Sequence, residues 1–260
     1  MIPKVIHYCW FGGKRKPKLI KDCINSWKYH LSDYEIIEWN EKNSDLTSPF
    51  VNEAYKLKKW AFVADFIRLK VLYENGGIYL DTDMMVTKSF DSLLVNECFF
   101  GAEDFEFISC GIIGARKKFL FINKCIDFYS DFQFSKEINL GMITIPRVVT
   151  KIYREIYKYE GDFVDTVRFE NLIIYPSIFF YSLPYKESEN MKNYKEYLTA
   201  DSFAVHLWNS SWIEHSEFYY ILRKEYIKGL VMVLNNLLLG RNTNIKYLKK
   251  IASCIKKSLN

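Results

Sequence analysis

The sequence has 260 residues, of which 49% are hydrophobic and 17% are aromatic, and it carries a formal net charge of +5. This length allows one large domain or two small ones, and the apolar content excludes a disordered chain. Residues 219–260 contain nine Lys or Arg and one acidic residue, a net charge of +8, so the rest of the chain carries −3. Because the basic charge is confined to this end, a general nucleic-acid-binding surface is not indicated.

The six cysteines show no CxxC spacing, which argues against a zinc cluster. The N-terminal residues enter a strand-like run at once, so a secretory signal peptide is not expected and reduced thiols in a cytoplasm are the simplest interpretation. The longest apolar stretch near the C-terminus, residues 229–240, is short and is interrupted by Asn235 and Asn236. It is therefore not expected to span a bilayer.

Strand-like and helix-like segments alternate along the first half of the chain. The expected elements are a strand at 3–10, a helix at 17–29, strands at 34–39 and 78–80 with a helix at 60–73 between them, strands at 99–102 and 108–114, and a helix at 119–132. The glycines at 76 and 77 suit a left-handed end to the 60–73 helix. This rhythm predicts an α/β fold with a mostly parallel sheet, formed by residues 1–218 and followed by a basic helical tail at 219–260.

Two carboxylates, Asp81 and Asp83, come directly after the predicted strand at 78–80. Ligands of open α/β sheets bind outside the carboxyl ends of the strands. A pair of acids two residues apart at that point can present oxygens to one divalent cation, which also takes substrate phosphate oxygens. Short acidic pairs also occur on solvated turns, so the pair alone is a weak signal.

Asp65 and Arg68 lie three residues apart on the predicted 60–73 helix, so their side chains share one face. On a solvated helix they would be an ordinary surface ion pair of little energetic value. The segment around them is strongly apolar, however, which indicates that most of this helix is buried. Buried charges require a partner or a functional role.

Three segments of the sequence resemble the family 32 glycosyltransferases, a group with a DXD-containing sugar-binding region found in polysaccharide biosynthesis, whose core is shared with the large clostridial glucosylating toxins. The matching segments are residues 2–12 (IPKVIHYCWFG), 64–83 (ADFIRLKVLYENGGIYLDTD) and 206–212 (HLWNSSW), in the family's order. The resemblance implies a GT-A-type α/β fold and a glycosyltransferase that uses a nucleotide sugar.

The resemblance also implies roles for individual residues. Asp83 would ligate a divalent cation, Mn²⁺ or Mg²⁺, and Asp81 would bind the ribose and a metal-bound water; Asp65 and Arg68 would bind hydroxyls of the donor sugar and ribose. The implied site is completed by Trp10 packed on the nucleobase, by Asn209 or Ser211 and Trp212 on the diphosphate and sugar, and by His206 as a further candidate metal ligand. Trp10, Trp212 and His206 could equally be ordinary core residues.

A cation held by Asp83 would neutralise the charge that grows on the leaving nucleoside diphosphate, and Arg68 would add fixed positive charge. Similar enzymes retain the anomeric configuration, and no carboxylate stands out as a nucleophile, so front-face attack by the acceptor hydroxyl is expected. UDP is favoured as the carrier, with GDP left open. Residues 109–111 and 139–146 depart from the family pattern, which leaves the donor sugar open.

Two other classes of protein place paired aspartates on an α/β sheet or combine them with many aromatics. A metal-dependent nucleotidyltransferase or phosphohydrolase should show a glycine-rich phosphate loop, and Gly12-Gly13-Lys14 is too short a match. Asp65, Asp81 and Asp83 argue against the other alternative, a non-catalytic carbohydrate-binding module, which stays open.

The tail combines apolar residues with lysines, five of which (Lys246, Lys249, Lys250, Lys256 and Lys257) lie in its last fifteen residues. Ile245, Leu248, Ile251, Ala252 and Ile255 follow helical spacing, and the lysines fall largely on the other side. Such basic amphipathic helices lie in membrane interfaces and are attracted by anionic lipid. Peripheral contact with the cytoplasmic membrane face would suit a polysaccharide-building enzyme with a lipid-linked saccharide acceptor. The alternative is an ordinary C-terminal helix with a solvated lysine face.

Overall fold

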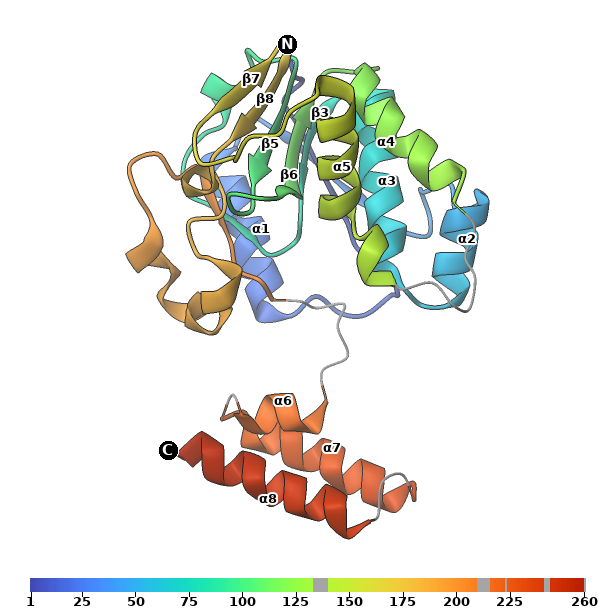
Figure 1. The fold of residues 1–260 in the computed structure, drawn as a ribbon, viewed down its shortest axis with the longest axis vertical. Helices are drawn as coiled ribbons and strands as arrows, with labels where there is room; N and C mark the ends of the chain where they lie inside the picture. The colour runs from blue at the N-terminus through green and yellow to red at the C-terminus, as the bar shows by residue number, and fades with distance from the viewer. Residues whose placement is uncertain (133–139, 210–215, 223, 241–243, 260) are drawn as a thin grey trace. The chain divides into compact units, whose positions relative to one another are not determined.

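The computed structural model describes residues 1–132, 140–209, 216–222, 224–240 and 244–259 (Figure 1). It divides into two compact units, 1–209 and 210–260. The predicted boundary between 218 and 219 falls inside a helix of the second unit, because the segment at 217–222 packs with the helices that follow it. No helix among the described residues is both long and apolar enough to cross a membrane.

A seven-stranded sheet in the order β2-β1-β3-β6-β5-β8-β7 forms the centre of the first unit. The strands are β1 (Val5–Cys9), β2 (Glu35–Trp39), β3 (Gly77–Leu80), β5 (Cys98–Ala102), β6 (Ile108–Ala115), β7 (Val167–Phe169) and β8 (Leu172–Tyr175). Five of them run in one direction, whereas β6 and β7 run against their neighbours. The predicted α/β class with a mostly parallel sheet is confirmed.

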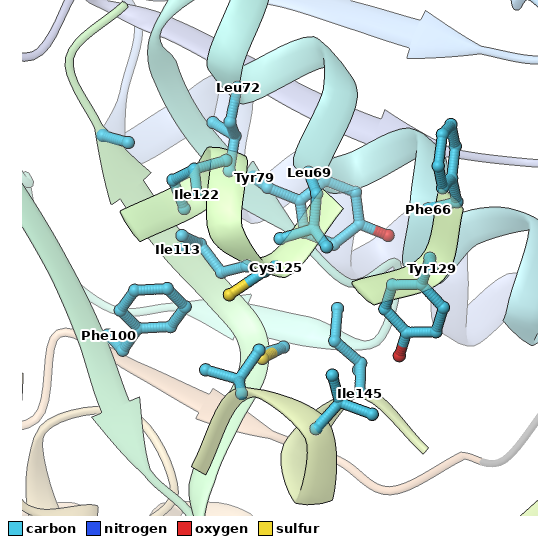
Figure 2. Packing of buried hydrophobic residues seen from close by; sticks show 14 of the residues in the cluster. Phe66, Leu69, Leu72, Tyr79, Phe100, Ile113, Ile122, Cys125, Tyr129 and Ile145 are labelled. Carbon is cyan, nitrogen blue, oxygen red and sulfur yellow. The ribbon is translucent and has the colours of Figure 1, made fainter. Parts of the chain in front are cut away.

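Helices flank both faces of this sheet (Figure 1). They are α1 (Lys18–His30), α2 (Pro49–Lys56), α3 (Trp60–Asn75), α4 (Leu120–Ser130) and α5 (Ile145–Tyr157). Short 3-10 helices lie at Asp91–Leu93, Leu140–Ile143 and Ser177–Phe179, and a longer, kinked 3-10 segment spans Tyr185–Tyr197. Because side chains alternate along a strand, Tyr79 of β3 belongs to one core cluster and Ile78 and Leu80 to the other. Figure 2 shows part of the first cluster, which includes Phe66 and Leu69 of α3, Tyr79 of β3 and Ile122 of α4.

Two glycines, Gly76 and Gly77, form the short connection from α3 to β3. Gly76 ends the helix at φ +71° and Gly77 follows at φ +111°, both in the region that favours glycine. A Cβ on Gly77 would lie 2.7 Å from the Val5 carbonyl oxygen and 2.9 Å from Nε2 of His7. The strand can therefore pair directly with β1, which places Asp81 immediately after the sheet edge.

A second, two-stranded sheet was not predicted from the sequence. It pairs β4 (Met84–Val86) antiparallel with β9 (Ala204–His206), so that Met84 lies opposite His206. Trp27 of α1 donates a hydrogen bond from its indole to the Met84 carbonyl at 2.7 Å, which holds β4 against the first helix. This small sheet brings a segment from the end of the first unit beside Asp83.

The second unit contains three helices, α6 (Glu217–Leu222), α7 (Tyr226–Leu238) and α8 (Ile245–Leu259). Its core is a separate cluster formed by Ile221, Val233, Tyr247, Ile251 and Cys254. Phe218 packs edge-on against Tyr247 with ring centroids 5.6 Å apart. Because this core joins all three helices, the end of the chain is a small folded unit rather than an extended tail.

Candidate active site

The predicted base-binding and acidic residues follow neighbouring parallel strands. Trp10 comes directly after β1 and Asp81 directly after β3, and these strands pair with His7 opposite Tyr79. The carboxyl ends of parallel strands are where α/β folds bind ligands. Trp10 is only partly buried, and Nζ of Lys16 lies over its ring, 5.4 Å from the ring centre.

Arg68 lies at the centre of a buried ionic cluster. Its Nη2 atom is 2.9 Å from Oδ1 of Asp65 and 3.3 Å from Oδ1 of Asp81. Its Nη1 atom donates a hydrogen bond to the Cys110 carbonyl at 2.7 Å, and the Tyr79 hydroxyl donates to Asp81 at 3.0 Å. Asp65 and Arg68 are 6% and 5% exposed, so they form a buried ion pair and not a surface one.

The charges in this cluster influence one another strongly. Burial raises the pKa of Asp65 to about 7, although the Arg68 guanidinium works in the opposite direction. Burial also works against the charged form of Arg68, but Asp81, Tyr79 and Asp65 outweigh it and raise the Arg68 pKa. Arg68 therefore remains a fixed cation between two carboxylates and orients Asp81 toward the edge of the sheet.

Asp83 contacts a different set of partners. Its Oδ1 atom lies 3.1 Å from Nε2 of His206, and its Oδ2 atom accepts a hydrogen bond from the Asn209 backbone N–H at 2.7 Å. Burial works to raise the pKa of Asp83, but the charge and hydrogen bond of His206 hold it below its usual value. The pairing of β4 with β9 thus joins the predicted acidic residue to the predicted histidine over a sequence separation of 123 residues.

Trp208 holds this segment in place and was not among the predicted site residues. Its backbone adopts φ +51°, an unfavourable value for a bulky residue, which indicates that its surroundings enforce the conformation. Its ring lies 4.0 Å from the His206 ring, and its indole N–H donates to the Leu183 carbonyl at 2.7 Å. Trp208 lies in the 206–212 segment that resembles the family, but the sequence analysis predicted a role only for Trp212.

Two further polar residues near His206 were missed by the sequence reasoning. Glu103 follows β5 and is partly buried, and burial raises its pKa although the nearby His206 works against this shift. The Tyr181 hydroxyl accepts a hydrogen bond from the Ile112 N–H at 3.1 Å. A Cβ on Gly111 would lie 3.0 Å from this hydroxyl and 3.3 Å from Asp81, so the glycine lets both groups approach β6.

The remaining predicted residues are placed only in part. Ser211 and Trp212 lie outside the described residues, so their predicted contacts stay predictions. Among the described residues, no three His, Cys, Asp or Glu side chains are close enough to hold a metal by themselves. Nδ1 of buried His206 has no hydrogen-bond partner within the described part of the chain. A cation bound here would have to take most of its ligands from phosphate oxygens and water, as Mg²⁺ usually does.

Two family profiles match the chain. The first, described as "Glycosyltransferase sugar-binding region containing DXD motif", matches residues 17–100. The second, described as "Alpha 1,4-glycosyltransferase conserved region", matches residues 115–227. The first range contains Asp65, Arg68, Asp81 and Asp83, and the second contains His206 and Asn209.

Individual proteins are also similar to the chain. An uncharacterized glycosyltransferase of Acanthamoeba polyphaga mimivirus is 26% identical over 83% of this chain and 85% of its own length. The human alpha-1,4-N-acetylglucosaminyltransferase is 29% identical over 58% of this chain, which spans only 44% of that protein. The solved PaToxG glycosyltransferase is 20% identical and covers 60% of this chain and 70% of its own, with a TM-score of 0.49.

The fold and the DXD turn at the sheet edge, together with the two profiles, define a glycosyltransferase. Over residues 17–100 the chain is similar to the family whose sugar-binding region contains a DXD motif. Its α/β architecture agrees with the GT-A type expected from the sequence.

Proposed function

We propose that this glycosyltransferase is metal-dependent and retaining, and that it moves a hexosyl group from a UDP-sugar to a saccharide acceptor. The observation that carries the proposal is the placement of Asp81 and Asp83. The two carboxylates leave the same strand end but contact separate partners, Arg68 in one case and His206 in the other. This division of roles suits one carboxylate that is positioned for ribose and another that binds a cation.

Asp83, His206 and Asp81 are the residues that would hold Mn²⁺ or Mg²⁺. The cation would neutralise charge on the diphosphate as it leaves. The low pKa of Asp83 supports this assignment, because a metal ligand must be available in its deprotonated form. Burial works to lower the pKa of His206, but Asp83 raises it, so His206 would have to release its proton to bind the cation. Arg68 and Tyr79 hold the Asp81 carboxylate in its orientation, and its oxygens would accept further contacts from the cation or its bound water.

The other side chains bind and orient the donor. Arg68 provides fixed positive charge without reorganisation, because three contacts hold its guanidinium in place. Asp65 fixes Arg68, and Trp10 would stack on the base. Asn209, Ser211 and Trp212 would close over the diphosphate and sugar and exclude water that could hydrolyse the donor. The alpha-1,4 linkage in the human relative's name supports retention of configuration.

The acceptor is proposed to be a lipid-linked saccharide in surface polysaccharide biosynthesis. Front-face attack by its hydroxyl, with the proton passing to the departing phosphate, needs no covalent enzyme intermediate. An enzyme with this acceptor works at a membrane surface on the cytoplasmic side, and the basic C-terminal unit is the part of the chain proposed to make that contact.

The metal assignment is tested with two matched substitutions. We expect Asp83→Asn to abolish sugar transfer and Asp81→Asn to leave a small residue of activity, with both proteins folded. Donor turnover would be measured with Mn²⁺ and with EDTA, and binding by thermal stabilisation, which reaches about 2.7 kcal/mol at 100 times the dissociation constant.

A near wild-type rate for Asp83→Asn in saturating Mn²⁺ would show that the metal assignment is wrong. Comparing UDP-sugars with GDP-sugars identifies the carrier. Release of pyrophosphate would indicate a nucleotidyltransferase, and stabilisation without turnover would indicate a binding module.

A further inference from the structure

Helix α7 carries an apolar stripe on its exposed side. Ile227 and Leu238 are 83% exposed, Leu234 is 57%, Val231 is 50% and Leu230 is 45%. Their spacing places all five on one face of the helix, within about 100° of its circumference. No charged residue interrupts this face, and monomeric proteins rarely expose contiguous apolar surface without a binding role.

The stripe is not needed to fold the C-terminal unit. Gly229 and Val233, on a different side of α7, are the buried residues of this helix, and Val233 belongs to the core of the unit. A Cβ on Gly229 would lie 2.7 Å from the Ile221 side chain, so α6 packs closely against that side. The exposed stripe is therefore additional to the side that holds the three helices together.

An apolar groove continues the stripe toward α8. It is lined by Ile221, Tyr226, Leu230, Ile255 and Leu259, with no polar lining. Leu230 belongs to both the stripe and the groove. The groove thus joins the exposed surface of α7 to the C-terminal end of α8.

Lysine residues of α8 adjoin one end of this apolar surface. The helix contains five lysines and no acidic residue, and Lys256 lies three positions before the groove residue Leu259, on a neighbouring side of the helix. The ion pair that the described residues form in this unit is Lys228–Glu225, which involves none of them. An apolar surface edged by unneutralised lysines complements a surface that is apolar inside and anionic outside.

The apolar side of α8, which the sequence analysis expected to face a membrane, instead packs into the core of the unit. Ile251 is buried in the helical core, as are Tyr247 and Cys254, so these residues cannot reach lipid while the unit is folded. Sequence spacing could not separate the inward residues of α8 from its outward ones. The exposed apolar surface lies instead mainly on α7.

We infer that the C-terminal unit binds an anionic membrane surface by inserting the α7 stripe and its groove among the lipid chains, with the α8 lysines on the headgroups. The inference deepens the proposed function, because a lipid-linked acceptor requires such contact. The binding itself needs no nucleotide sugar and can be measured separately.

The experiment uses the full chain and vesicles of phosphatidylcholine with and without phosphatidylglycerol. The wild type is expected to co-sediment with the anionic vesicles. Ile227→Ser combined with Leu234→Ser should lower the bound fraction relative to free protein by at least about tenfold, because two exposed side chains lose their apolar contact. Asn235→Ser, an exposed change on α7 outside the stripe, is the matched control and should bind normally.

Lys256→Gln combined with Lys257→Gln should weaken binding about fivefold per lysine at low salt and reduce its salt dependence. Donor hydrolysis and sedimentation velocity are recorded for every variant. Wild-type vesicle binding by the stripe variant would overturn the inference.

A change of oligomeric state in the stripe variant would instead assign the stripe to a second copy of the chain. A lowered melting temperature of the catalytic unit in the stripe variant would instead assign the stripe to contact with that unit. Absence of donor hydrolysis in the wild type, with intact vesicle binding, would refute the proposed function and leave this inference standing.

Discussion

At the scale of single residues, Arg68 organises the candidate site. Its guanidinium serves Asp65, Asp81 and the Cys110 carbonyl at once, which only a planar group with several donors can do. The sequence indicated the pair on α3 because three-residue spacing and the apolar surroundings could be read directly. It could not indicate Cys110 or Tyr79 as partners, because these contacts depend on how β6 and β3 pair.

Arg68→Lys tests whether this geometry serves catalysis. Lysine keeps the charge but cannot reproduce the three directed contacts, so we expect the rate per folded enzyme to fall more than tenfold, equivalent to about 1.4 kcal/mol of transition-state stabilisation. The control is Lys70→Gln, on the same helix as Arg68. It removes a partly exposed ion pair between Lys70 and Asp45 and should leave the rate unchanged. Melting temperature and rate are measured together; lower stability with normal turnover would mean that Arg68 is only structural.

At the scale of elements, the sequence predicted those whose patterns are local. The α3–β3 junction could be predicted because an apolar run ends at two glycines. The direction of β6 could not, because alternation or apolarity of a strand says nothing about which way it runs. The three-residue strands β4 and β9 are too short to give a pattern, so the contact between Asp83 and His206 was visible only as a resemblance.

His7 connects β1, β2 and α3, and its hydrogen bonds define its protonation state. The Trp39 indole can only donate, and it donates to Nδ1 at 3.1 Å, so Nε2 carries the proton and donates to the Gly76 carbonyl at 2.8 Å. Burial lowers the pKa of His7, although the Gly76 carbonyl and Glu35 work against this shift. The folded protein therefore holds His7 neutral at a pH where the unfolded chain is already protonated.

This difference predicts the sign of a pH effect. The contribution of His7 is fully present above its unfolded pKa of about 6.5 and is lost as the pH falls toward the lower folded value. We expect the melting temperature of the catalytic unit to decrease from pH 7 to pH 5 more in the wild type than in His7→Gln. His30→Gln, at the end of α1, is the control and should follow the wild type. Parallel curves for the wild type and His7→Gln would contradict the assignment.

At the scale of the whole molecule, the chain separates catalytic residues from basic charge. The described candidate site residues, from Trp10 to Asn209, belong to the first unit, and the second has its own core. Composition indicated this division, because the basic residues cluster after 218, but it placed the boundary inside α6. Charge composition does not record which residues pack together, and Phe218 belongs to the helical core.

The separate core makes a point substitution a sharper test of the second unit than truncation. Removing residues 241–260 would delete α8 and expose Ile221 and Val233, so it would unfold the unit and not merely remove lysines. Ile251→Ala should instead cost about 2–4 kcal/mol, a large part of the stability of so small a unit.

We expect calorimetry of Ile251→Ala to show a lower transition for the C-terminal unit only, with donor hydrolysis retained and vesicle binding weakened. Ser253→Ala, an exposed change on α8, should alter none of these. If Ile251→Ala also lowered the transition of the catalytic unit or its stabilisation by nucleotide sugar, the two units would be energetically coupled, and the separation of catalysis from membrane binding would be wrong.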